Sequence, residues 1–164
     1  FLTSLAALAG PVTGNVIERK LSNGLTVLMK EVHSAPVVTA QIWFRTGSAS
    51  EHTGITGISH LLEHMLFNSS KNYKKGEITR LVQECGGIEN GATAQDFTYY
   101  WNLMSSDHLD FAMKILAEKS GNALIKADEL IKERSVVLSE IRGYQNEPDR
   151  LLYDAVNSMA FTAH

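Results

Sequence analysis

Cysteine is nearly absent from this sequence: Cys85 is the only one among 164 residues. A single cysteine cannot form an internal disulfide, and it cannot supply the several thiolates of a cysteine-rich zinc finger. Long hydrophobic runs are absent too, since no segment approaches the roughly 20 apolar residues that cross a bilayer. The sequence therefore predicts neither a disulfide-stapled scaffold nor a membrane span.

Excess positive charge is also lacking. The formal net charge is −3 and the sequence pI is about 6.1, whereas nucleic acids and anionic membranes select basic faces. Neither is favoured as a partner. With 44% hydrophobic and 20% charged residues, the composition is that of an ordinary globular domain that can bury its own core.

Both ends of the sequence have the features of a cut chain. The opening FLTSLAALAG has no initial methionine, and Ala7 and Ala9 have the small-x-small spacing of a signal-peptide cleavage site. We therefore expect residues 1–9 to be a signal-peptide remnant, with an N-terminal helix as the alternative, and the protein to be periplasmic or secreted. The closing LLYDAVNSMAFTAH stops within an apolar periodicity, so we expect the domain of residues 10–164 to be incomplete at its C-terminal end.

Apolar periodicity and turn residues divide the chain into strands and helices. Asn23-Gly24 lies between two apolar-rich runs and is a strong signal for a tight hairpin. Gly86-Gly87 can end a helix in left-handed backbone, and Pro148 suits a first helical turn. We expect strands at 15–21, 25–31, 37–46, 88–95 and 97–104, and helices at 58–67, within 76–87, at 107–122, from 128 to about 145, and from 148 to the end.

The order of these elements predicts the fold class. Three strands, two helices, two strands and three helices follow one another, so the helices are grouped instead of alternating strictly with strands. This order indicates an α+β protein, a two-layer sandwich in which a largely antiparallel sheet packs against helices. Ser106 and Asp128 are the expected N-caps of two later helices.

The stretch GISHLLEHMLF, residues 57–67, places His60, Glu63 and His64 in an otherwise apolar run. Residues four apart lie one above the other on a helix, so the two imidazoles can bind one cation, and neutral imidazole suits zinc. Glu63 lies on the flank of the same face, where its carboxylate can take a proton from a water molecule at the metal. Two histidines at this spacing also arise by chance, but the glutamate completes the order His-x-x-Glu-His, the inverted form of the zincin motif.

A catalytic zinc needs a third protein ligand and an open position for water. Glu133 and Glu140, on a later helix, are close to two turns apart and therefore share one face. An acidic pair on a helix is more often solvated surface. Here Val136, Val137 and Ile141 surround it, which predicts a partly buried face where an unpaired carboxylate is costly.

A different enzyme class shares the histidine motif. S-ribosylhomocysteine lyase, a small carbon–sulfur lyase, also carries His-x-x-Glu-His on a helix, and its length is close to that of this chain. That enzyme needs one cysteine as third ligand and another as acid and base. Cys85, beside a helix-ending Gly-Gly, is the single candidate, so the lyase remains the weaker alternative.

Five segments in the same order resemble the inverted-zincin zinc peptidases, the family of pitrilysin, insulin-degrading enzyme and mitochondrial processing peptidase. The segments read LSNGLTVLM, GSASEHTGITGISHLLEHMLF, GEITRLVQECGG, TYYW and ERSVVLSEI, and the resemblance as a whole covers about residues 16–163. The resemblance implies the metallohydrolase fold of mitochondrial processing peptidase. It also implies that residues 10–164 are the N-terminal catalytic domain of a zinc endopeptidase that cleaves peptides.

The family pattern assigns roles by position. It implies that His60, His64 and Glu140 are ligands of Zn²⁺ and that Glu63 is the general base. It implies that Glu133 supports the site from behind the ligands.

The resemblance also implies how peptide and partners are held. Family members bind extended peptides along a sheet edge, which corresponds here to Asn90, Gly91 and Ala92. Many members have Asn-Ala and then a bulky aromatic residue there, so this chain departs from the pattern. Active members close a chamber with a homologous second domain or partner subunit, and the 164 residues alone can be inactive. A non-catalytic or partner-dependent subunit of the family, and a mitochondrial matrix location, stay open as alternatives.

Overall fold

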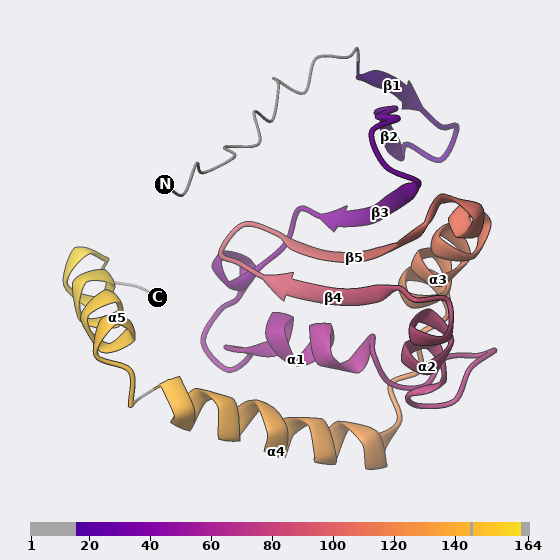
Figure 1. Ribbon diagram of the computed structural model, residues 1–164. Helices are drawn as coiled ribbons and strands as arrows, with labels where there is room; N and C mark the ends of the chain where they lie inside the picture. The colour runs from indigo at the N-terminus through magenta and orange to yellow at the C-terminus, as the bar shows by residue number, and fades with distance from the viewer. Residues whose placement is uncertain (1–15, 145, 162–164) are drawn as a thin grey trace, which may run out of the picture. The chain divides into compact units, whose positions relative to one another are not determined.

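The computed structural model describes residues 16–144 and 146–161 (Figure 1). The expected signal-peptide remnant at residues 1–9 lies outside this described part. The chain divides into two compact units, residues 1–36 and 37–164. No helix among the described residues has the length and apolar character needed to cross a membrane.

The first unit contains a two-stranded antiparallel hairpin. Strands β1 (Ile17–Lys20) and β2 (Thr26–Met29) pair in register from Ile17 opposite Met29 to Lys20 opposite Thr26. Gly24 has φ +90°, in the left-handed region that glycine tolerates, and the Asn23 side chain accepts a hydrogen bond from the Leu25 N–H at 3.1 Å. The predicted Asn-Gly hairpin is confirmed.

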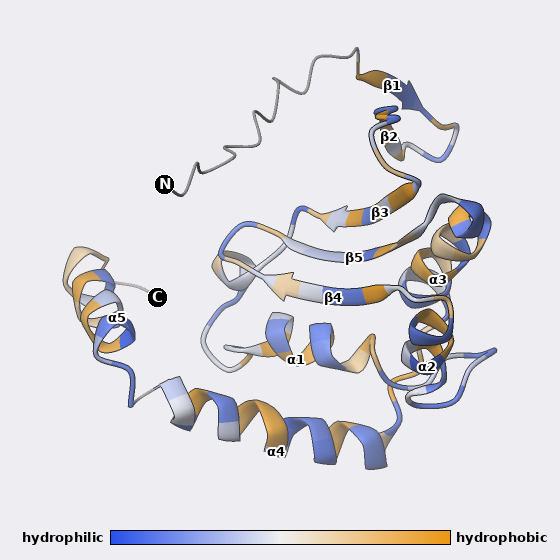
Figure 2. Cartoon of the chain, in the orientation of Figure 1, coloured by the Kyte–Doolittle hydropathy of each residue, from blue (hydrophilic) through white to orange (hydrophobic). Residues whose placement is uncertain are grey.

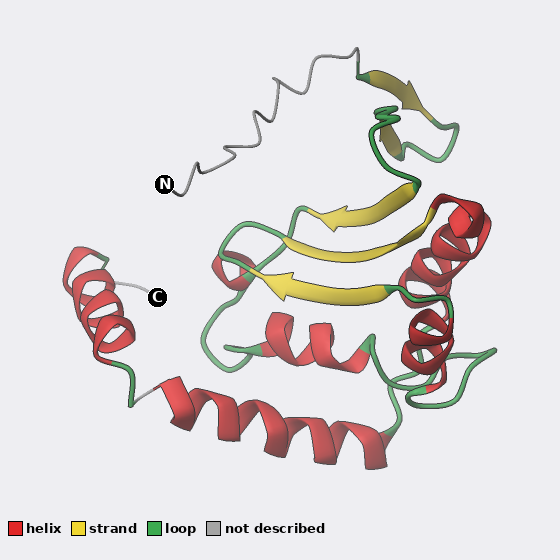
Figure 3. Cartoon of the chain, viewed as in Figure 1, coloured by secondary structure: helices red, strands yellow, loops and turns green. Residues whose placement is uncertain are grey.

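The second unit is built on a three-stranded antiparallel sheet in the order β3-β5-β4 (Figure 3). Its strands are β3 (Val37–Phe44), β4 (Ile88–Thr93) and β5 (Thr98–Ser105). The central strand β5 pairs along its whole length with β3 and along most of it with β4. Strand β4 has no second partner strand among the described residues, so its outer side is a sheet edge.

Helices make up the rest of the second unit. Two short 3₁₀ turns, η1 and η2, precede α1 and α3. The bounds are η1 (Ser48–Ser50), α1 (Ile58–Met65), α2 (Glu77–Glu84), η2 (Ser106–His108), α3 (Leu109–Asn122), α4 (Ala127–Tyr144) and α5 (Pro148–Ala160). All five predicted helices are present.

The two predicted N-caps are wrong. Ser106 belongs to η2, and α3 begins only at Leu109 with no side-chain cap. The chain makes a 3₁₀ turn between β5 and α3, so the serine is already inside helical backbone. Helix α4 begins at Ala127, which places Asp128 within the first turn. There its negative charge still interacts favourably with the positive N-terminal end of the helix dipole.

The core lies between one face of the sheet and helices α2 and α3. Alternate residues of β5 point into it, so its burial pattern has a period of two. The apolar stripes of the helices supply the other side (Figure 2). The cluster consists of Ala40, Ile78, Val82, Tyr100, Met104, Ala112, Ile115 and Leu116. This sheet-on-helix packing confirms the predicted two-layer α+β sandwich.

A close backbone contact anchors the loop that leads to α1. The N–H groups of Ser48 and Ala49 donate hydrogen bonds of 3.0 and 2.8 Å to the carbonyl oxygens of Ala94 and Gln95 in the β4–β5 turn. A Cβ atom added to Gly47 would overlap the Ala94 carbonyl oxygen and lie 2.6 Å from that of Gln95. Position 47 therefore requires glycine.

Candidate metal centre

Helix α1 carries the histidine motif, and a carboxylate fixes its start. The Glu51 side chain accepts hydrogen bonds from the N–H groups of Gly57, at 2.6 Å, and Ser59, at 2.8 Å. Both N–H groups lie at the N-terminus of the helix, where backbone donors have no partner within the helix. Gly57 has φ +88°, which turns the chain into the helix. The loop before α1 therefore fixes where the helix starts, and with it the place of His60 in the first turn of the helix.

The structure brings His60, His64 and Glu140 together. The Glu140 Oε2 atom lies 3.6 Å from His60 Nε2 and 3.5 Å from His64 Nε2. One ligand atom from each of the three residues can be chosen so that all lie within 4.8 Å of one another. Helix α4 runs along α1 (Figure 1), which places Glu140 opposite the two imidazoles.

This geometry fits a zinc ion. Tetrahedral zinc with nitrogen and oxygen ligands at about 2.0–2.1 Å places neighbouring ligand atoms roughly 3.4 Å apart. The two nitrogen–oxygen distances of 3.5 and 3.6 Å are close to this value. Two imidazoles and one carboxylate are a donor set that suits zinc, and three protein ligands leave a fourth position for water.

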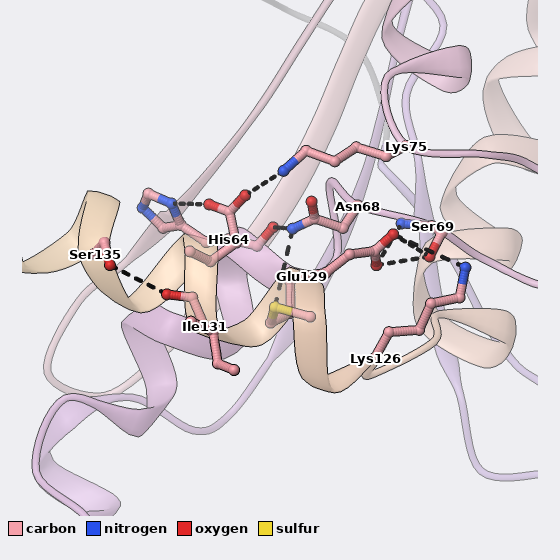
Figure 4. Close-up of polar contacts among 10 residues, drawn as sticks. His64, Asn68, Ser69, Lys75, Lys126, Glu129, Ile131 and Ser135 are labelled. Carbon is pink, nitrogen blue, oxygen red and sulfur yellow. Dashed lines mark hydrogen bonds and ion pairs between the residues drawn. The ribbon is translucent and has the colours of Figure 1, made fainter.

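Glu133 lies behind His64. Its Oε2 atom is 3.3 Å from His64 Nδ1, and its Oε1 atom accepts a 2.7 Å hydrogen bond from Lys75 Nζ (Figure 4). Partial burial raises the pKa of the Glu133 carboxyl. Hydrogen bonds from Lys75, His64 and Asn68, together with the positive charge of Lys75, outweigh this effect, and the pKa lies below its ordinary value. A carboxylate at Nδ1 favours the tautomer whose Nε2 lone pair is free for a metal.

Glu63 lies outside the cluster of His60, His64 and Glu140, and a residue of strand β4 holds its side chain. Its Oε2 atom accepts a 2.6 Å hydrogen bond from the Thr93 hydroxyl, and its side chain is almost buried. On its core side lies Tyr100, whose hydroxyl pKa is raised by burial and by the Glu63 charge. The Thr93 hydrogen bond thus fixes a carboxylate beside the histidines.

The predicted apolar surroundings of Glu140 are only partly correct. Val137 is buried, but Val136 and Ile141 are 44% and 43% exposed, and the Glu140 side chain is 37% exposed. Glu133, in contrast, is only 11% exposed. Glu133 therefore lies on the covered face of α4, while Glu140 lies at its open rim.

A cleft of about 570 Å³ opens over these residues. Its walls include the motif residues, Glu133, Glu140 and Lys75, and also Asn90 of β4. Gly91 and Ala92, predicted with Asn90 to contact peptide, continue along the β4 edge but do not line the cleft. A Cβ at Gly91 would lie 3.0 Å from Tyr100 and 3.2 Å from Phe67, so glycine lets the strand approach both rings.

Three contacts at the site were not predicted from the sequence. They involve Glu51, Thr93 and Lys75. Glu51 accepts from N–H groups six and eight residues further along the chain. Thr93 lies 30 residues from Glu63, and Lys75 lies 58 residues from Glu133. No spacing rule links residues on different elements, so none of the three has a signal in the sequence pattern.

Comparison with known proteins shows the family of the chain. The family described as Insulinase (Peptidase family M16) matches residues 26–164. Zinc protease PqqE of Helicobacter pylori is 36% identical over 146 residues, which are 88% of this chain and 33% of that protein. An uncharacterized zinc protease of Bacillus subtilis, YmxG, is 30% identical over 142 residues, 87% of this chain and 35% of that protein.

A solved structure is similar as well. The crystal structure of a protease from Helicobacter pylori matches with a TM-score of 0.81 and 35% sequence identity, over 85% of this chain and 34% of that one. The chain therefore belongs to the insulinase family, peptidase family M16. It spans about a third of the length of the curated relatives that it matches. The predicted family is confirmed.

Proposed function

We propose that this protein is a zinc-dependent endopeptidase that hydrolyses extended peptides, with residues 10–164 as part of its N-terminal catalytic domain. One observation carries the proposal. His60, His64 and Glu140 lie around one point, with Glu63 on the flank of the same helix. Relatives that share the family and the fold are named zinc proteases, which supports both the peptidase activity and zinc as the metal.

His60, His64 and Glu140 would hold the zinc ion. When bound, zinc supplies a Lewis acid that makes water a better nucleophile and polarises a carbonyl oxygen. Glu133 keeps the His64 ring in place from its far side, since it contacts Nδ1 and leaves Nε2 directed at Glu140. Glu140, on the exposed rim of α4, completes the set without closing the cleft.

Glu63 would act as the general base. Its carboxylate accepts the proton of the attacking water and delivers it to the leaving amine nitrogen of the peptide. Thr93 donates to Oε2, which orients the carboxylate and leaves its other oxygen for the proton. Because water and peptide must both approach this carboxylate, the open cleft beside it is needed.

An extended peptide would add to the free edge of β4. Main-chain hydrogen bonds at Asn90, Gly91 and Ala92 would align it with the sheet, in the manner of strand addition. Asn90 lies at the cleft, so this edge leads a peptide past the proposed base. A homologous second domain or partner subunit would complete the substrate chamber; one relative is a probable mitochondrial-processing peptidase subunit beta of Arabidopsis thaliana.

A non-catalytic, partner-dependent subunit of the family is the second candidate, since one relative is named as a subunit, the probable mitochondrial-processing peptidase subunit beta of Arabidopsis thaliana. Retention of both histidines, Glu63 and Glu140 supports the peptidase instead. For the location we propose the periplasm or the exterior, on the strength of the Ala7-Leu8-Ala9 pattern. The mitochondrial matrix is the alternative location.

The test is a Glu63→Gln variant of the intact protein, assayed with quenched fluorescent peptides and by metal analysis. We expect about one zinc per chain in both proteins, and cleavage lowered at least about a hundredfold in the variant, because the general base is lost. Cleavage that survives the substitution while zinc stays bound would overturn the proposed mechanism. Absence of zinc from the unaltered protein would overturn the metal assignment.

A further inference from the structure

Lys75 is the lysine that lines the cleft over the histidines. Its ammonium group lies 2.7 Å from Glu133 Oε1 and also lines the cleft that contains the histidines. The two oxygens of Glu133 have different partners, Lys75 on one side and His64 Nδ1 on the other (Figure 4). Lys75, Glu133 and His64 thus form a continuous row of contacts that ends at a proposed zinc ligand.

The loop that carries Lys75 is fixed by hydrogen bonds on both sides of the residue. The Lys74 N–H donates to the Glu77 side chain at 2.9 Å, and the Glu77 N–H donates to the Lys74 carbonyl at 3.0 Å. Gly76 between them has φ +77°, a left-handed conformation that closes this turn. The Lys75 backbone is therefore held in place, and its side chain starts from a defined point.

The surroundings of Glu133 make this ion pair stronger than an ordinary surface pair. Ion pairs between exposed side chains contribute little to the stability of the fold, because water screens both charges. Here the Glu133 side chain is 11% exposed and that of Lys75 is 49% exposed. The Glu133 carboxylate is largely shielded from water, so it depends on hydrogen bonds from protein groups, of which that of Lys75 is the one that carries a full positive charge; His64 and Asn68 supply the others.

We propose that Lys75 is a positioning residue of the metal centre: it holds the Glu133 carboxylate against His64 Nδ1 and thereby keeps His64 Nε2 directed at the zinc position. This rests on the proposed function, since it requires His64 to be a zinc ligand. Without the ammonium group, the Glu133 Oε1 atom turns toward water and the contact with Nδ1 loosens. Lys75 acts through Glu133 and does not bind the metal.

The test measures the zinc dissociation constant of the intact protein by competition with a chromophoric chelator. The variants are Lys75→Met, Lys75→Arg, Glu133→Gln and the double variant Lys75→Met/Glu133→Gln. Lys74→Met is the control, because the Lys74 side chain does not line the cleft. Contacts behind metal ligands typically change metal affinity about 10- to 100-fold. We expect the Lys75→Met variant to bind zinc about tenfold more weakly, and Lys75→Arg to stay within about threefold of the unaltered protein, since arginine keeps the charge and the donor.

The double variant decides how Lys75 acts. If the effect runs through Glu133, adding Lys75→Met to Glu133→Gln weakens zinc binding no further. A full additional tenfold loss would overturn the proposal, and so would unchanged zinc affinity of Lys75→Met alone. Failure of the unaltered protein to bind zinc would overturn the proposed function and this inference with it. Unchanged affinity of Lys75→Met beside a loss of binding in a His64→Ala variant would overturn the inference alone.

Discussion

The Glu118 carboxylate gives a pH-dependent prediction whose size follows from the structure. Glu118 is buried and fastens the loop after α1 to helix α3. It accepts hydrogen bonds from the Asn72 N–H at 3.1 Å, the Asn72 side chain at 2.9 Å and the Asn122 side chain at 2.8 Å. Burial alone would raise the pKa of this carboxyl, but hydrogen bonds from Ser70, Asn72 and Asn122 outweigh it and lower the pKa to about 2.

A lowered pKa in the folded state stabilises the protein above the unfolded-state pKa, and this contribution is lost as the pH falls through the folded-state value. With an ordinary value of 4.5 and a folded value of about 2, the contribution near pH 7 is at most about 3 kcal/mol. About 2 kcal/mol of it is lost by pH 3. The Glu118→Gln variant lacks this contribution at every pH.

Urea unfolding of both proteins at pH 7 and pH 3, with a chelator present so that zinc does not contribute, measures the effect. We expect the difference in unfolding free energy between the two proteins to narrow by about 2 kcal/mol at the lower pH. Glu84→Gln serves as the control, since the Glu84 side chain is 55% exposed. The Glu84→Gln variant removes only an exposed ion pair with Arg80, so its unfolding free energy should stay within about 1 kcal/mol of that of the unaltered protein at both pH values. If the unaltered protein and Glu118→Gln differ by the same unfolding free energy at both pH values, the hydrogen bonds to Glu118 do not stabilise the protein through a lowered pKa.

Three further substitutions test particular contacts. Thr93→Val removes the hydroxyl that donates to Glu63; we expect kcat for peptide cleavage to fall about tenfold with zinc content unchanged, and an unchanged kcat would contradict the proposed role. Lys119→Met leaves the buried Glu89 side chain without its 3.0 Å ion-pair partner. Denaturant unfolding should show that the free energy of unfolding falls by about 3–5 kcal/mol, and a decrease below about 1 kcal/mol would contradict the burial of the pair. Gly47→Ala forces a Cβ against the β4–β5 turn; thermal melting should show destabilisation of about 1–3 kcal/mol, and an unchanged melting temperature would show that the contact is looser than described.

Local patterns were sufficient to predict the elements of the fold. Three signals depend only on residues close together in the chain and could therefore be recognised in the sequence: the Asn23-Gly24 turn, the apolar periodicity of 58–67 and the Gly86-Gly87 helix end. The antiparallel sheet followed from the grouping of the strands. The two N-cap predictions failed because the exact entry into a helix depends on the turn that precedes it.

Local patterns could predict only part of the candidate site. His60, Glu63 and His64 share one short helix, so their spacing alone places them on adjoining faces. The pairing of α1 with α4, in contrast, depends on how two helices far apart in the chain pack. The apolar pattern around Glu140 could not distinguish the covered side of α4, which includes Val137, from the exposed side.

The most direct test of the proposed zinc site is an anomalous difference map, collected at the zinc absorption edge, from crystals of the intact protein grown with zinc. We expect a single strong peak at about 2.0–2.2 Å from His60 Nε2, His64 Nε2 and a Glu140 carboxylate oxygen. A peak on other residues, or none at this position, would show that these three side chains do not form the zinc site.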